Sequence, residues 1–121
     1  MRVFFYVLNK TELLNTLLDT FAHNGITGAT IIESTGMARI LSSKYDEDEL
    51  PFLASLRNFL NPERSHSNVI FMVIEDGQLQ EVVDIIEKIV GDLAEDNNGI
   101  AFSLPLDYVK GTIRNGNRIG K

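Results

Sequence analysis

The sequence contains no cysteine, which excludes disulfide bonds, thiolate metal sites and cysteine nucleophiles. It also lacks long apolar runs. The longest uninterrupted ones, Val3–Leu8 and Val69–Ile74, are far shorter than the roughly 18 residues that span a bilayer, and they are too short for a signal-peptide core. We therefore expect a cytoplasmic protein that does not insert into membranes.

Basic residues are outnumbered, with 11 Lys and Arg against 17 Asp and Glu, which gives a formal net charge of −6. Because sequence-independent nucleic-acid binding draws its affinity from phosphate neutralisation, this balance argues against a nucleic-acid partner. RNA-recognition sheets also need basic residues around their stacking aromatics. The exception is the C-terminal end, where residues 110–121 carry four basic residues and no acid.

Common enzyme motifs are missing as well. There is no Gly-x-Ser-x-Gly elbow, no Gly-Lys-Ser/Thr phosphate loop, no Gly-x-Gly-x-x-Gly and no His-Glu-x-x-His. Neither His23 nor His66 has a companion at metal-ligand spacing. We therefore predict no catalytic residue and no metal site.

A chain of 121 residues with 44% hydrophobic residues fits one domain, residues 1–121, with its own core. The apolar run Arg2–Leu8 predicts a buried strand. A helix should follow it, with Asn9 as N-cap, Glu12 completing a capping box and Gly25 ending the helix. The β-branched residues of Ile26–Thr35 predict the second strand.

The second half repeats this order. Val69–Glu75 predicts a strand, Asp76 should cap a helix that runs to about Leu93, and Ile100–Leu104 predicts the last strand. The pattern of the second strand also extends as far as Leu41. Together the elements predict an α+β, ferredoxin-like βαββαβ fold, in which a four-stranded antiparallel sheet carries two helices on one face.

The connection Ser42–Asn68 is longer than most loops inside compact domains, and long loops are often functional. It contains an acidic cluster, Asp46 to Glu49, and a predicted short amphipathic helix over Pro51–Leu60. Two interpretations remain open. The helix covers a sheet edge, or the loop docks on a protein partner through Phe52, Leu56 and Phe59.

The predicted strands are apolar on both faces. In the first strand, one face carries Val3, Phe5 and Val7, and the other carries Phe4, Tyr6 and Leu8. A sheet with one solvated face would instead alternate apolar and polar residues. Since burial of each large side chain is worth roughly 1.5–3 kcal/mol, a bare second face would forfeit on the order of 10 kcal/mol. We therefore predict an obligate homo-oligomer.

The second strand reads Gly-Ile-Thr-Gly-Ala-Thr from Gly25, followed by Glu33, Gly36 and Arg39 in the spacing Glu-x-x-Gly-x-x-Arg. This resembles the PII nitrogen-regulatory signal-transduction proteins. The likeness covers most of the chain: residues 42–68 take the place of the family's T-loop, and residues 105–121 form a C-terminal tail.

The resemblance implies a homotrimer whose sheets line a central barrel, with adenine nucleotides or other small effectors between subunits and a T-loop that regulates a protein partner. Independently of it, Arg39 stands at a strand–loop junction that suits an anion contact, and Gly36 is interpreted as a backbone hinge with unusual torsions. The candidate effector-binding residues are Thr30, Gly36, Met37, Arg39, Asn98, Gly99, Lys110 and Arg114.

The sequence departs from the family at the phosphate-binding B-loop, which is glycine-rich and closes with Gly-Lys. Residues 92–100 read Asp-Leu-Ala-Glu-Asp-Asn-Asn-Gly-Ile here, so Ile100 takes the lysine position. Three carboxylates without a cation would repel a triphosphate, which argues against a standard Mg-ATP site. The glutamine linked to 2-oxoglutarate binding is replaced by Ile40. Residues 97–99 form either a turn, the favoured interpretation, or a phosphate cradle.

Other functions remain open, because a fold does not fix a function. One alternative is a small enzyme on a ferredoxin-like scaffold, and another is an amino-acid-binding regulatory module. A third is a purely structural protein that captures a partner without any ligand.

Overall fold

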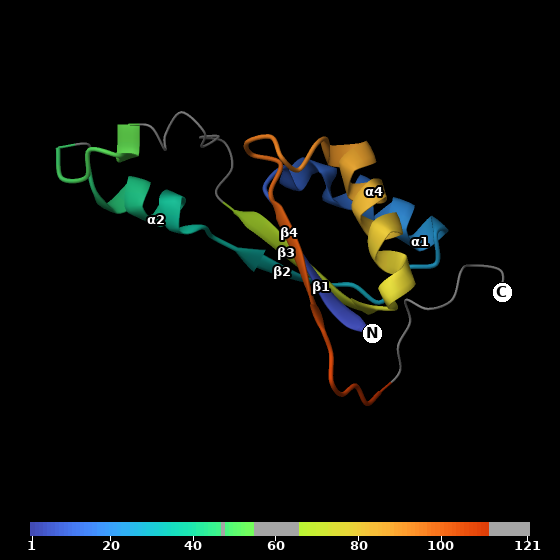
Figure 1. Ribbon diagram of the computed structural model, residues 1–121. Coiled ribbons are helices and arrows are strands. Elements are labelled where there is room, and N and C mark those ends of the chain that lie inside the picture. Colours follow the sequence, from blue (N-terminus) through green and yellow to red (C-terminus); the bar gives the residue numbers. More distant parts are fainter. Residues whose placement is uncertain (47, 55–65, 112–121) are drawn as a thin grey trace.

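A computed structural model describes residues 1–46, 48–54 and 66–111 (Figure 1). The elements in chain order are β1 (Arg2–Leu8), η1 (Thr11–Leu13), α1 (Leu14–His23), β2 (Thr30–Ser34), α2 (Met37–Lys44), β3 (Ser67–Ile74), η2 (Asp76–Gln78), α4 (Leu79–Val90) and β4 (Ile100–Pro105). The strands form one antiparallel sheet in the order β2-β3-β1-β4. This confirms the predicted α+β, ferredoxin-like fold.

The core lies between the sheet and the two helices α1 and α4, which cover the same sheet face (Figure 1). Alternate residues of the two central strands point into it, and each is at most 1% exposed: Phe4, Tyr6 and Leu8 of β1, and Ile70, Met72 and Ile74 of β3. The helices contribute Leu17, Phe21, Val82 and Ile86. None of the helices in the described ranges is long and apolar enough to traverse a lipid bilayer.

Both predicted N-caps are wrong. The Asn9 side chain does not cap the first helix, because its Oδ1 accepts a hydrogen bond from Ser67 Oγ at 2.9 Å. The second helix is capped one residue earlier than Asp76. Glu75 accepts a bond from the backbone of Gln78, whose side chain accepts one from the Glu75 N–H at 2.9 Å, which is a capping box.

The segment after α1 also differs from the prediction. Gly25, with φ 81°, ends the helix region as expected, but β2 covers only Thr30–Ser34. The strand pattern does not continue to Leu41, because Met37–Lys44 forms α2 from residues of mostly high helix propensity. The connection between α2 and β3 is therefore residues 45–66, and most of the helix predicted over Pro51–Leu60 lies outside the described residues.

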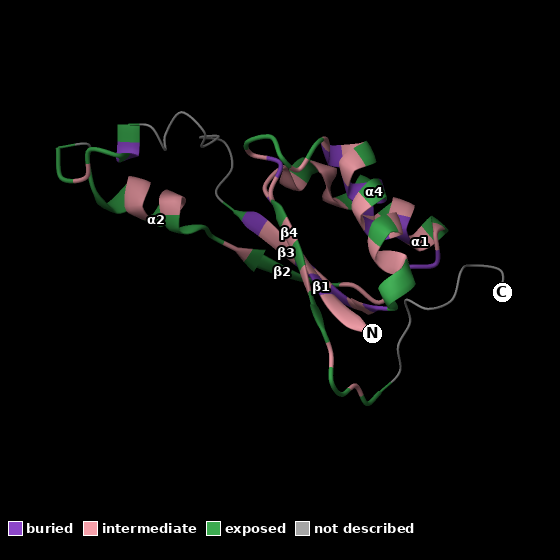
Figure 2. Cartoon of the chain, in the orientation of Figure 1, coloured by how far each residue is buried: buried purple, intermediate pink, exposed green. Residues whose placement is uncertain are grey.

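The second sheet face carries no helix, and it is apolar as predicted. Strand register and alternation place thirteen residues on it. Two of them, Ser34 and Ser67, pair at one end of the sheet. The other eleven are here called the open sheet face: Val3, Phe5, Val7, Thr30, Ile32, Val69, Phe71, Val73, Ile100, Phe102 and Leu104. The ring of Phe5 lies 5.1 Å from that of Phe102 and 5.8 Å from that of Phe71, centroid to centroid. The edge residues are about half exposed, and β4 appears mostly green in Figure 2.

Candidate functional site

The predicted effector residues on α2 begin directly after β2. Gly36 is the N-cap of α2 with φ −78° and ψ 159°, an extended conformation open to any residue, and a Cβ there would meet nothing within 4 Å. The predicted hinge with unusual torsions is therefore wrong. Met37 is 75% exposed, and Arg39 is half-buried on the same helix.

Thr30 lies at the other end of β2. It pairs with Phe71 on the open sheet face and is exposed. Four steps along the extended strand, about 13 Å, separate it from Ser34, where the chain leaves the sheet towards α2. Thr30 is therefore a residue of the apolar face and not a neighbour of Arg39 within one chain.

Asn98 and Gly99 have a structural role in the fold. The Tyr6 hydroxyl donates a 2.5 Å hydrogen bond to the backbone oxygen of Asn98, which is 3% exposed. Burial raises the pKa of the Tyr6 phenol to about 12, so the donor keeps its proton at neutral pH. Gly99 has φ 92°, and a Cβ there would overlap the Val7 carbonyl oxygen. These contacts support a turn.

Three amides of this segment, here called the 92–99 turn, donate to oxygens of the chain, and two of these oxygens belong to carboxylates. The Leu93 N–H donates to Glu87 Oε2 at 3.0 Å, and the Ala94 N–H donates to Asp92 Oδ1 at 2.8 Å. The Glu95 N–H donates to the Asp92 backbone oxygen at 3.1 Å. Three successive amides that could face an external anion are thus bonded within the chain.

The charges of this turn disfavour a nucleoside triphosphate. Phosphates need free N–H donors or cations, and the turn's charged side chains are the exposed carboxylates of Asp92, Glu95 and Asp96. The predicted cradle role of Asn98 and Gly99 has no support in this geometry, because both residues are packed against β1.

Arg39 and the 92–99 turn belong to the same end of the sheet but to opposite edges. The residues that pair near this end are Val7 with Ile100 and Asn68 with Glu33. Since β3 and β1 separate β2 from β4, the two edges are three strand spacings apart, about 14 Å. One chain therefore does not bring the two groups into a single cleft.

Two of the remaining predicted residues, Lys110 and Phe52, lie in the described part of the chain. Lys110 follows Pro105, which pairs with Arg2 at the opposite end, and it is exposed. Phe52 is 50% exposed. Arg114, Leu56 and Phe59 lie outside the described residues.

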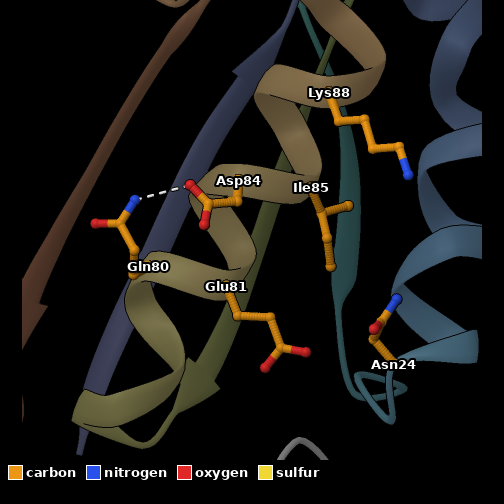
Figure 3. Close-up of a pocket in the computed structure, with 6 residues that line it drawn as sticks. All are labelled: Asn24, Gln80, Glu81, Asp84, Ile85 and Lys88. Atoms are coloured by element: carbon orange, nitrogen blue, oxygen red, sulfur yellow. Dashed lines mark hydrogen bonds between the residues drawn. The ribbon is translucent and has the colours of Figure 1, made fainter.

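A shallow pocket of about 550 Å³ opens between α4 and the end of α1 (Figure 3). Its lining residues are Asn24, Gln80, Glu81, Asp84, Ile85 and Lys88. None of the predicted effector residues that the structure describes lines it. Within it, Gln80 Nε2 donates to Asp84 Oδ1 at 2.8 Å, so these two side chains are already bonded to each other.

The sequence prediction missed the residues that build the 92–99 turn, above all Tyr6 and Glu87. A signal for the turn was present: Gly91 and Gly99 bracket a stretch rich in Asp and Asn, and both glycines adopt positive φ, as does Asn97. Gly91, with φ 114°, also ends the second helix at Val90, short of the predicted Leu93. The partner of each carboxylate could not be read from residue order.

No family model matches the sequence, and no curated protein matches it. Over the described ranges, no three His, Cys, Asp or Glu side chains gather closely enough to hold a metal ion.

Proposed function

We propose that this chain is a PII-like signalling protein of the cytoplasm that acts as a homotrimer. It binds a small anionic effector in clefts between subunits and regulates a protein partner through the 42–68 loop. The observation that carries the proposal is the open sheet face, because burial of that face between copies creates clefts at the sheet edges.

The size and chemistry of the open sheet face favour other copies of the chain as its cover. Four strands at about 4.8 Å spacing and six residues at about 3.3 Å give it an area of roughly 400 Å². That is comparable to the largest apolar patch of a typical monomer, about 300–600 Å², and such patches are often interaction sites. The face has no charged residue, so a second copy approaches it without desolvating charge, whereas nucleic acid finds no cation.

The sheet edges explain why the effector site belongs between subunits. Arg39, which follows β2, and the 92–99 turn, which precedes β4, are too far apart in one chain to share a small ligand. If the β2 edge of one copy lies beside the β4 edge of the next, the two groups face one cleft. The Arg39 guanidinium then supplies the bidentate donor for an anionic group.

The chain after β2 provides the surface for the partner. In Figure 1, α2 and the segment that follows it project from the end of β2, away from α1 and α4. Exposed apolar residues lie on this projection: Met37 is 75% exposed, Phe52 50% and Ile40 49%. An effector that contacts Arg39 and prefers one arrangement of this projection shifts the population toward it, which changes partner binding.

The test is a thermal-shift panel of adenine nucleotides and anionic metabolites, with calorimetry on each hit. Arg39→Ala should weaken binding of the hit by about tenfold or more, the equivalent of about 1.4 kcal/mol for a lost charged contact. Lys44→Ala removes a cation of the same helix at an exposed position and should leave the affinity unchanged. If no anion stabilises the protein, or if both variants bind equally well, the proposed function is wrong.

A further inference from the structure

We infer that Glu87 and Asp92 are built-in anions of the 92–99 turn and that they exclude phosphate from it. The effector then carries a single anionic group, bound on the Arg39 side, and presents a neutral or cationic portion to the turn. This inference rests on the proposed function only in placing the turn beside the effector.

Two successive backbone N–H groups of the turn already donate to carboxylates of this chain. Successive N–H groups in a turn are a common way to bind an external anion. Here the Leu93 and Ala94 N–H groups donate to the side-chain carboxylates of Glu87 and Asp92, at 3.0 and 2.8 Å. Hydrogen bonds to a charged acceptor are stronger than neutral ones, so a phosphate must displace a bound anion before it can use these donors.

The turn is also held in the conformation that keeps these donors occupied. Asp92 is fixed twice, since its backbone oxygen accepts both the Glu95 N–H and the Asn98 Nδ2, the latter at 2.7 Å. Asn98 is in turn anchored to the core by the Tyr6 hydroxyl. These bonds fix the backbone at Asp92, from which the side-chain Oδ1 reaches the Ala94 N–H.

The negative charge around the turn also opposes phosphate binding. Glu87, Asp92, Glu95 and Asp96 lie within ten residues of one another, and Lys88 is the only cation between residues 87 and 99. Lys88 lines the pocket between α4 and the end of α1 (Figure 3). A polyphosphate placed here gains no cation and meets four carboxylates, whereas a neutral or cationic group meets no such repulsion.

The direct test follows the amide resonances of Leu93 and Ala94 by NMR while pyrophosphate is added to the full chain. In the wild-type protein both should remain unshifted at millimolar pyrophosphate. Glu87→Ala frees the Leu93 donor, and its resonance should then shift saturably. Glu81→Ala, which removes the same charge elsewhere on α4, should behave as wild type.

Saturable shifts of both amides in the wild-type protein would overturn the inference, and so would an unresponsive Glu87→Ala variant. If Glu87→Ala does not fold, Asp92→Ala, which removes the acceptor of the Ala94 N–H, serves in its place with the Ala94 resonance. The wild-type titration decides the first point without any variant.

Calorimetry with adenosine, AMP, ADP and ATP separates this inference from the proposed function. Affinity should not rise with the number of phosphates, whereas a tenfold gain for each added phosphate would contradict the inference. If none of the four binds, the nucleotide part of the proposed function fails, and the amide titration still decides whether the turn excludes phosphate.

Discussion

Replacing Tyr6 by phenylalanine removes the anchor of the 92–99 turn while leaving the core packing in place. Tyr6 is fully buried, and its hydroxyl donates the 2.5 Å bond to the Asn98 backbone oxygen. The phenylalanine ring fills the same space but leaves that buried oxygen without a donor. The expected loss is about 1–3 kcal/mol of unfolding free energy, the cost of an unsatisfied buried polar group.

The same substitution predicts a change in the pH dependence of stability. Burial raises the pKa of the Tyr6 phenol from 10.0 to about 12 in the folded chain. Between these values the unfolded chain has released the proton and the folded chain has not, so the stabilisation is complete below pH 10 and is lost as pH rises through 12. The stability difference between wild type and Tyr6→Phe should therefore narrow over this window.

Urea unfolding followed by circular dichroism measures both effects, at neutral pH and at steps through the alkaline window. Tyr108→Phe is the matched control, because Tyr108 is 76% exposed and loss of its hydroxyl should leave the stability at neutral pH unchanged. A Tyr6→Phe variant as stable as wild type at neutral pH, or a difference that stays constant as the pH rises, would refute the role assigned to this hydroxyl.

Two further substitutions have matched controls. Gly99→Ala should lower the unfolding free energy by at least about 1–2 kcal/mol, because φ is 92° and the new Cβ would overlap the Val7 carbonyl. Gly36→Ala should change it by no more than about 0.5 kcal/mol. Equal urea midpoints for the two variants would contradict this. Phe102→Lys should dissociate the proposed oligomer, as measured by sedimentation velocity. Ile40→Lys should not, although Ile40 is as exposed (49%) as Phe102 (47%) in the single chain. Loss of assembly in Ile40→Lys alone would place the subunit contact on α2.

The sheet and its two apolar faces were predictable because they depend on periodicity. In β1 and β3 every second residue enters the core, and the residues between them are equally apolar, so the pattern identified the strands and both faces without knowledge of the fold. The apolar stripe along α4 was predicted for the same reason. These signals are local, and tertiary contacts reinforce them.

The errors occurred where a contact distant in sequence decides the outcome. Asn9 has the residue type of an N-cap, yet its side chain accepts a hydrogen bond from Ser67, which is distant in the sequence. The 92–99 turn depends on Tyr6 from the first strand and on Glu87 from the preceding helix. Composition showed that carboxylates gather there. Only the three-dimensional arrangement shows that two of them accept hydrogen bonds from the Leu93 and Ala94 amides.

The proposed effector site depends on the proposed association of copies through the open sheet face. Light scattering coupled to size-exclusion chromatography, on the wild-type chain at micromolar concentration, measures it directly. We predict a single species with three times the 13.5 kDa mass of one chain. A species of 13.5 kDa at the same concentrations would contradict the account.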